Sequence, residues 1–128
     1  MTSGISPLAG KAVLVVEDEY MIADDLAREL RGAGAHVVGP AASLPQAMRL
    51  SDAGALDLAI LDINLREMLV YPLIDALLAA GVKVLLTSGY DEAMILDRYH
   101  DLPRCEKPVT TERLRRAAEA LFDEAARG

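Results

Sequence analysis

Cysteine and long apolar runs are both scarce in this chain. Its 128 residues include one cysteine, Cys105, so no internal disulfide can form, and a reducing compartment is expected. No apolar run reaches the roughly 20 residues that a membrane-spanning helix needs. Residues 1–10 also lack the charged start and apolar core of a secretion signal. We therefore expect a cytoplasmic protein that does not contact a membrane.

Basic residues are also few. The chain has 13 Lys and Arg against 20 Asp and Glu, which gives a net charge of −7. A surface of this sign repels phosphate backbones, and no cluster of basic and aromatic residues offsets it. We therefore expect no direct binding to nucleic acid. The acidic excess can instead attract a metal ion or a basic protein partner.

Short runs rich in β-forming residues alternate with helical patterns from Lys11 onward, which predicts an α/β fold with a parallel sheet. Residues 1–10 show no periodic pattern and predict a flexible lead-in, so one domain is expected over residues 11–126. Strands are predicted at 12–16, 35–39, 56–63, 82–86 and 102–106. Helices are predicted to follow them at about 22–33, 43–52, 69–80, 91–99 and 110–125.

Two of these helices carry clear start signals. Ser43 and Gln46 form a capping box, with Pro45 in the first turn. Thr110 is expected to cap the last helix, whose apolar residues fall on one stripe. The last strand is polar enough to lie at an edge of the sheet.

Charged and hydroxyl side chains stand where the predicted strands end. Ligands of such sheets bind beyond the carboxyl ends of the strands, so these residues are expected to converge. They are Glu17, Asp18 and Glu19 after the first strand, Asp62 at the end of the third, Thr87 and Ser88 after the fourth, and Lys107 after the fifth.

This set has the chemistry of a phosphoryl site. Clustered carboxylates raise each other's proton affinity unless a cation neutralises them, and Mg²⁺ (or Mn²⁺) accepts such oxygen ligands. Asp62 is placed to act as a nucleophile that forms an aspartyl phosphate. Lys107 and a hydroxyl of the fourth strand can each bind a phosphoryl oxygen.

Each residue alone has a simpler interpretation. The acidic residues at 17–19 can stabilise the start of a helix, and Asp62 can be a helix N-cap. Lys107 can be a solvated side chain, and Ser88 a loop residue. Their joint position on strand ends favours one site over four unrelated roles.

The chain resembles the response-regulator receiver domain of two-component signalling over residues 11–126. The matching segments are VLVVEDE at 13–19, LDIN at 61–64, LTSGY at 86–90 and KP at 107–108. The resemblance implies a flavodoxin-like, doubly wound sheet of five parallel strands in the order 2-1-3-4-5, with five helices.

The resemblance also assigns roles to single residues. Glu17 and Asp18 would be the acidic metal pair, and Asp62 would be both phosphoacceptor and metal ligand. Asn64 would offer its backbone carbonyl to the metal. Lys107 would bind the phosphoryl group.

The same resemblance implies a switch hydroxyl on the fourth strand. Ser88 is the preferred candidate because it directly precedes a small residue, and Thr87 is the alternative. Many receivers carry Tyr or Phe three residues before the lysine, but this chain has Arg104, so a relay through that aromatic is not expected. The turn that includes Tyr90 is expected to move instead, as in an atypical single-domain subset of receivers.

The leading hypothesis is a phosphoacceptor switch, not an enzyme with turnover. A sensor histidine kinase or a phosphotransfer protein would supply the phosphoryl group. A downstream protein would bind near the fourth helix, fifth strand and fifth helix. Two alternatives stay open: a phosphohydrolase with an Asp62 nucleophile, and a receiver-like interaction module that needs no phosphate. A flavin-binding role is least favoured, because the acidic turn would repel the flavin phosphate.

Overall fold

A five-stranded sheet forms the middle layer of the protein. The computed structural model describes residues 5–65, 68–89, 99 and 101–123. The strands of the sheet are β1 (Ala12–Val16), β2 (His36–Ala41), β3 (Leu58–Asp62), β6 (Lys83–Ser88) and β7 (Arg104–Glu106). All neighbours run parallel, in the order β2-β1-β3-β6-β7. This confirms the expected flavodoxin-like order 2-1-3-4-5, with the polar last strand at an edge.

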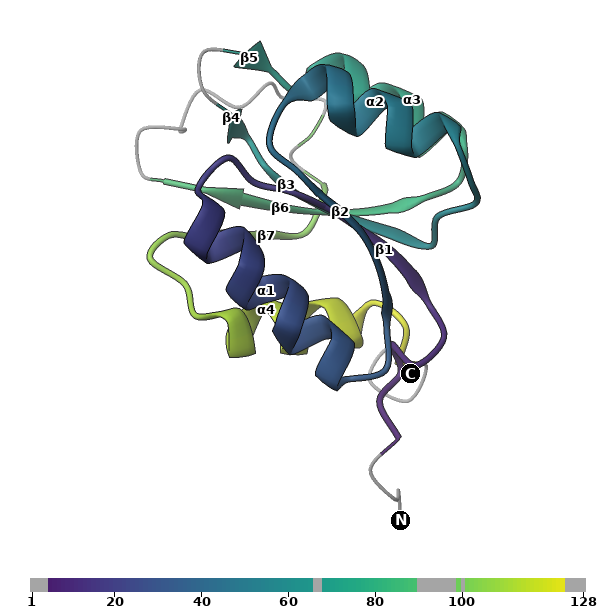
Figure 1. Ribbon diagram of the computed structural model, residues 1–128, viewed down its shortest axis with the longest axis vertical. Helices are drawn as coiled ribbons and strands as arrows, with labels where there is room; N and C mark the ends of the chain where they lie inside the picture. The colour runs from purple at the N-terminus through teal and green to yellow at the C-terminus, as the bar shows by residue number, and fades with distance from the viewer. Residues whose placement is uncertain (1–4, 66–67, 90–98, 100, 124–128) are drawn as a thin grey trace.

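Helices cover both faces of the sheet (Figure 1). The described residues form four helices: α1 (Tyr20–Gly32), α2 (Leu44–Asp52), α3 (Tyr71–Ala79) and α4 (Thr111–Ala120). α1 and α4 lie on one face, and α2 and α3 lie on the other. The helix predicted at 91–99 falls outside the described residues, apart from Tyr99. None of the described helices has the length and apolar character to cross a membrane.

The sheet is buried because each of its faces packs against a helical layer. One apolar cluster lies between the sheet and the layer of α2 and α3, and a second lies under α1 and α4. All five residues of β3 are buried, as expected for a continuous apolar strand in a parallel sheet. Asp62 is therefore the one ionisable residue of a strand that water scarcely reaches.

The predicted helix caps are present. The Ser43 hydroxyl accepts a hydrogen bond from the Gln46 amide at 3.3 Å, and Gln46 Oε1 accepts one from the Ala42 amide at 3.1 Å. The Thr110 hydroxyl likewise accepts from the Arg113 amide at 3.1 Å. The Gln46 and Arg113 amides lie in the first turns of α2 and α4, where the helix itself leaves an amide without a partner, and the caps satisfy them.

Several predicted boundaries were wrong by a few residues. β2 continues to Ala41 instead of ending at Gly39, because the chain bulges there and then pairs again with β1. α3 begins at Tyr71, with Pro72 in its first turn, and not at Leu69. The sequence pattern also missed a small antiparallel pair of strands, β4 (Asn64–Leu65) and β5 (Met68–Leu69).

The described part of the lead-in, residues 5–10, packs against the rest of the domain, whereas the sequence pattern predicted a flexible segment. Leu8 is fully buried in the apolar cluster under α1 and α4. The Ser6 hydroxyl donates to Glu119 Oε2 at 2.6 Å, and the Gly10 amide donates to the Gly34 carbonyl at 3.0 Å. A single leucine is too short a pattern to reveal this packing in the sequence. The domain boundaries at residues 11 and 126 stay a prediction.

We expect Leu8→Ala to lower the free energy of unfolding by roughly 2–4 kcal/mol, the usual cost of truncating a fully buried leucine. Urea denaturation followed by circular dichroism measures this change. Ile5→Ala is the matched control, because Ile5 is 79% exposed in the same segment. Equal, small effects of both substitutions would contradict the burial of Leu8.

Candidate functional site

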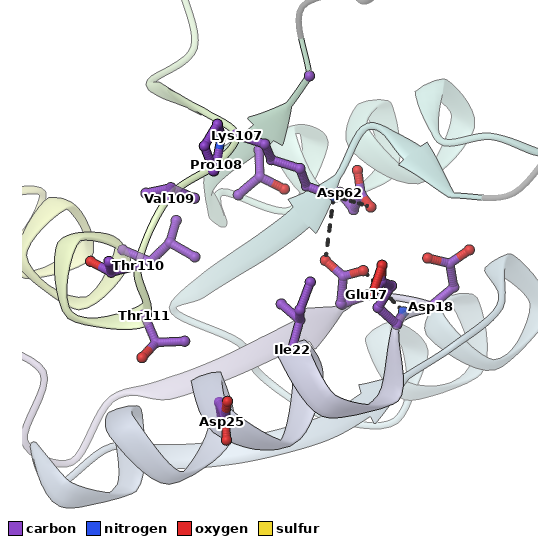
Figure 2. Close-up of a pocket in the computed structure, with 14 residues that line it drawn as sticks. Glu17, Asp18, Ile22, Asp25, Asp62, Lys107, Pro108, Val109, Thr110 and Thr111 are labelled. Carbon is purple, nitrogen blue, oxygen red and sulfur yellow. Dashed lines mark hydrogen bonds and ion pairs between the residues drawn. The ribbon is translucent and has the colours of Figure 1, made fainter.

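The carboxyl ends of four strands bring the candidate residues to one edge of the sheet. Asp62 is the last residue of β3, and Glu17 and Asp18 directly follow β1. Thr87 lies in β6 opposite Asp62, and Lys107 directly follows β7. These five residues line one cleft between α1 and the segment that leads into α4 (Figure 2). The arrangement brings together four segments that are far apart in sequence.

Three carboxylates form a tight cluster in this cleft. Glu17, Asp18 and Asp62 each offer an oxygen, and these oxygens all lie within 4.8 Å of one another. Glu17 is 6% exposed and Asp62 is 4% exposed, so both carboxylates are largely removed from water. Like charges this close, and this poorly solvated, need a cation beside them.

Lys107 supplies a positive charge within the protein. Its ammonium nitrogen donates a hydrogen bond to Asp62 Oδ2 at 2.8 Å and lies 3.8 Å from Glu17 Oε1. Burial by itself would lower the pKa of Lys107. The hydrogen bond to Asp62, with the charges of the cluster, outweighs that effect and raises the pKa. The lysine is therefore held in its charged form and aimed at the carboxylate of Asp62.

Among the carboxylates that the structure describes, Glu17 has the most strongly shifted pKa. Burial raises its pKa from the ordinary value of 4.5 to about 7, and the nearby charge of Asp62 adds to the rise. The Glu19 amide opposes this effect by donating to Glu17 Oε2 at 3.0 Å, and so does the charge of Lys107. Ionising Glu17 therefore costs free energy in the metal-free protein, and a further cation beside it would reduce that cost.

The cluster suits a small divalent cation. Mg²⁺ takes oxygen ligands and is commonly held by one or two carboxylates together with phosphate oxygens and water. Glu17, Asp18 and Asp62 provide such oxygens from two adjacent strands, β1 and β3. The cleft of about 830 Å³ leaves room for a phosphoryl group beside them. The residues present therefore fit magnesium, and Asp62 would be one of the three carboxylates that hold it.

This chain is a response-regulator receiver domain. The family model of the response regulator receiver domain matches residues 13–119, which contain all the residues of the acidic cluster and Lys107. The comparison with curated proteins found no match.

Solved structures place this receiver among related receivers. It is similar to SdrG from Sphingomonas melonis Fr1, with 31% identity over 92% of this chain and 99% of that one, and a TM-score of 0.76. It is also similar to the receiver domain of PhyR from Erythrobacter litoralis, with 25% identity, coverage of 89% and 92%, and a TM-score of 0.76. A CheY-like receiver from Methanospirillum hungatei JF-1, at 23% identity, shares its fold over 93% and 98% of the two chains, with a TM-score of 0.77.

The two candidate switch hydroxyls of the receiver differ in placement. Thr87 is in register with Asp62 on the neighbouring strand and lines the cleft. Ser88 is one residue further along β6, and successive side chains of a strand point to opposite faces. Both residues are buried, and Ser88 is not among the described residues that line the cleft. Placement therefore favours Thr87, the alternative, over the preferred Ser88, and the switch role itself stays a prediction.

Three other predicted positions contribute less to the described site. Asn64 begins β4 directly beyond the acidic cluster, and the role of its carbonyl stays a prediction. Tyr90 lies outside the described residues. Arg104 opens β7 and is exposed, so no buried aromatic occupies that position. A buried aromatic stands at Tyr99 instead, whose ring stacks on Tyr71 at 5.1 Å between centroids.

The apolar wall of the cleft was not predicted. Ile22, Val109 and Leu114 line it beside the acidic cluster. Ile22 was predicted as part of the apolar stripe of the first helix, yet it is 36% exposed. It lies in the first turn of α1 and lines the cleft beside the acidic residues that follow β1. Helical spacing alone gave no signal for this position, because it cannot show where the underlying sheet ends.

We expect Glu17→Gln to stabilise the metal-free protein at pH 8 by up to about 3 kcal/mol, at roughly 1.4 kcal/mol for each pKa unit. The raised pKa means that the stability of the native protein falls as the pH rises from about 4.5 to 7, because in this range the unfolded chain releases a proton that the native state still holds. The substitution removes this fall.

Thermal unfolding between pH 4 and 8, in the presence of a chelator, measures the difference. Glu106→Gln is the control, since Glu106 is exposed on β7. A gap between Glu17→Gln and the unmodified protein that stays constant with pH would contradict the assignment.

Proposed function

We propose that this receiver accepts a phosphoryl group on Asp62 in a magnesium-dependent reaction. A sensor histidine kinase or a phosphotransfer protein supplies the group, and the phosphorylated receiver signals through contact with a further protein. The observation that supports this most directly is the contact of 2.8 Å between Lys107 and Asp62 beside the carboxylates of Glu17 and Asp18. It combines a nucleophile, a fixed positive charge and a cation site in one cleft.

The reaction follows from the chemistry of these groups. A carboxylate oxygen of Asp62 forms a bond to the phosphorus atom while the bond from phosphorus to the donor's imidazole nitrogen breaks, and that nitrogen keeps the electron pair. Glu17, Asp18 and Asp62 would hold Mg²⁺, which would supply positive charge to neutralise the phosphoryl and carboxylate oxygens. Lys107 remains charged throughout and can exchange its bond to Asp62 for one to a phosphoryl oxygen.

The signal arises from the charge that the phosphoryl group adds. It brings about −1.5 to −2 charges and three strong acceptor oxygens to the cleft. The Thr87 hydroxyl, on the strand beside Asp62, is placed to donate to one of them. Moving that hydroxyl shifts the end of β6, which is the change that a protein partner can detect.

The partner surfaces divide between two parts of the domain. The phosphoryl donor must reach Asp62 through the cleft between α1 and the start of α4, since the acidic cluster opens there. We infer that the downstream protein contacts the region of β7 and α4. The helix predicted at 91–99 is also part of that expected surface, but it falls outside the described residues apart from Tyr99.

We expect one phosphoryl group per chain when the protein is incubated with Mg²⁺ and a small acyl phosphate, read as intact mass. Asp62→Asn should abolish the adduct, and a chelator should suppress it in the unmodified protein. Asp24→Asn is the matched control, because Asp24 is an exposed carboxylate on α1 paired with Arg28. An undiminished adduct on Asp62→Asn would refute the proposal.

Two further measurements test the two alternatives. Sustained release of phosphate from a generic phosphomonoester would indicate a phosphohydrolase. A partner that binds the unmodified chain and Asp62→Asn equally well would indicate a module that needs no phosphate.

We expect Thr87→Ala to remove the response of β6 to phosphorylation, whereas Ser88→Ala should keep it. The reason is that Thr87 lines the cleft next to Asp62 and Ser88 does not. Backbone NMR shifts, compared between the Mg²⁺ form and the form with added beryllofluoride, report that response. A lost response in Ser88→Ala with a normal one in Thr87→Ala would reverse the assignment.

A further inference from the structure

β2 contains one residue more than β1 in the stretch where the two strands approach the acidic cluster. Val38 pairs with Leu14, and Ala41 pairs with Val16, so two residues of β2 face the single residue Val15 of β1. Such a bulge bends one strand and changes where its next backbone groups point. Here the next backbone group is the carbonyl of Ala41.

The bulge depends on Gly39. Pro40 has no amide hydrogen and cannot continue the ladder of hydrogen bonds to β1. Gly39 has a φ of +95°, in the region that glycine enters without a steric cost. A Cβ atom at this position would lie 2.8 Å from the amide nitrogen of Ala41 and 3.2 Å from the carbonyl oxygen of Val15. Both neighbours are backbone atoms, so any other residue must displace one of the two strands.

The two strands that a side chain would displace both hold Glu17. The Glu17 amide donates to the Ala41 carbonyl at 3.0 Å, one residue beyond the end of β1. Val15 stands two residues before Glu17 on β1 itself. Glu17 then accepts a hydrogen bond from the Glu19 amide, which closes the acidic turn. The backbone of that turn is therefore fixed on its β2 side by the bulge.

We propose that Gly39 is a positioning residue for the metal carboxylates Glu17 and Asp18. Because Gly39 has no side chain, β2 can bulge and then pair with β1 again at Ala41. The Ala41 carbonyl then fixes the position of the acidic turn through its hydrogen bond with the Glu17 amide. This inference rests on the proposed metal-dependent function, because the affinity of the site for Mg²⁺ is the quantity that Gly39 controls.

The test compares Gly39→Ala with Gly81→Ala. Gly81 also has a positive φ, of +81°, but a Cβ there meets no atom within 4 Å, and the residue precedes the amino end of β6. Both substitutions strain the backbone and lower the melting temperature. Only Gly39→Ala should weaken Mg²⁺ binding, by about tenfold or more, as expected when the support of a metal ligand is lost.

The affinity is measured by calorimetric titration with Mg²⁺ at a temperature well below unfolding, where a loss of stability alone leaves the dissociation constant unchanged. Equal Mg²⁺ affinities of Gly39→Ala and the unmodified protein would overturn the role of Gly39 and leave the proposed function standing. Failure of the unmodified protein to bind Mg²⁺ would overturn both.

Gly39→Asn provides a second variant if Gly39→Ala does not fold. Asparagine tolerates positive φ better than alanine, yet its Cβ meets the same backbone atoms. It should weaken Mg²⁺ binding, whereas Gly81→Asn should not. If neither variant at position 39 folds, amide hydrogen exchange on the unmodified chain decides. Slow exchange at Glu17 that Mg²⁺ slows further supports the inference, and fast exchange at Glu17 overturns it.

Discussion

The ion pair between Lys107 and Asp62 is the interaction on which the site depends. Without it, the buried carboxylates of Asp62 and Glu17 would lose the ammonium group that lies 2.8 Å and 3.8 Å from their oxygens. Removing one partner of a buried pair leaves an uncompensated charge, which is far more costly than the pair itself. The lysine thus allows a carboxylate to stand at the end of an otherwise apolar strand.

The same constraint explains why the charges lie where they do. The strands β1 and β3 are covered on both faces, so they carry no ionisable side chain before the carboxyl edge of the sheet. At the carboxyl edge the strands end, and side chains from the ends of four strands converge. A parallel sheet therefore gathers distant residues into one cleft without any of them being close in sequence.

Positive charge in this cleft can come from Lys107 or from a bound metal ion, and the two differ in which carboxylates they contact. Lys107 offers a single charge on a flexible side chain that reaches Asp62 directly, whereas a divalent ion could be held by oxygens of Glu17, Asp18 and Asp62. The raised pKa of Glu17 reflects a cluster that the lysine only partly neutralises. A cluster that is left short of positive charge in this way favours the binding of a further cation over a closed structural salt bridge.

Much of the site could be predicted from residue type and strand ends. Glu17, Asp18, Asp62 and Lys107 each end or follow a predicted strand, and the structure brings them together at one edge of the sheet. The helix caps at Ser43 and Thr110 were equally readable, because a cap needs only neighbours within four residues. Predictions of this kind rely on local chemistry and on the alternation of strands and helices.

The sequence by itself determined the order of the elements and the chemical types of the groups at the sheet edge. Only the tertiary structure decided that Thr87 faces the cleft, that Ile22 forms its wall, that Leu8 belongs to the core and that Gly39 creates a bulge. Each of these depends on the register between strands or on packing between segments distant in the chain. Register and packing are fixed by many weak contacts acting together, and no single stretch of sequence contains them.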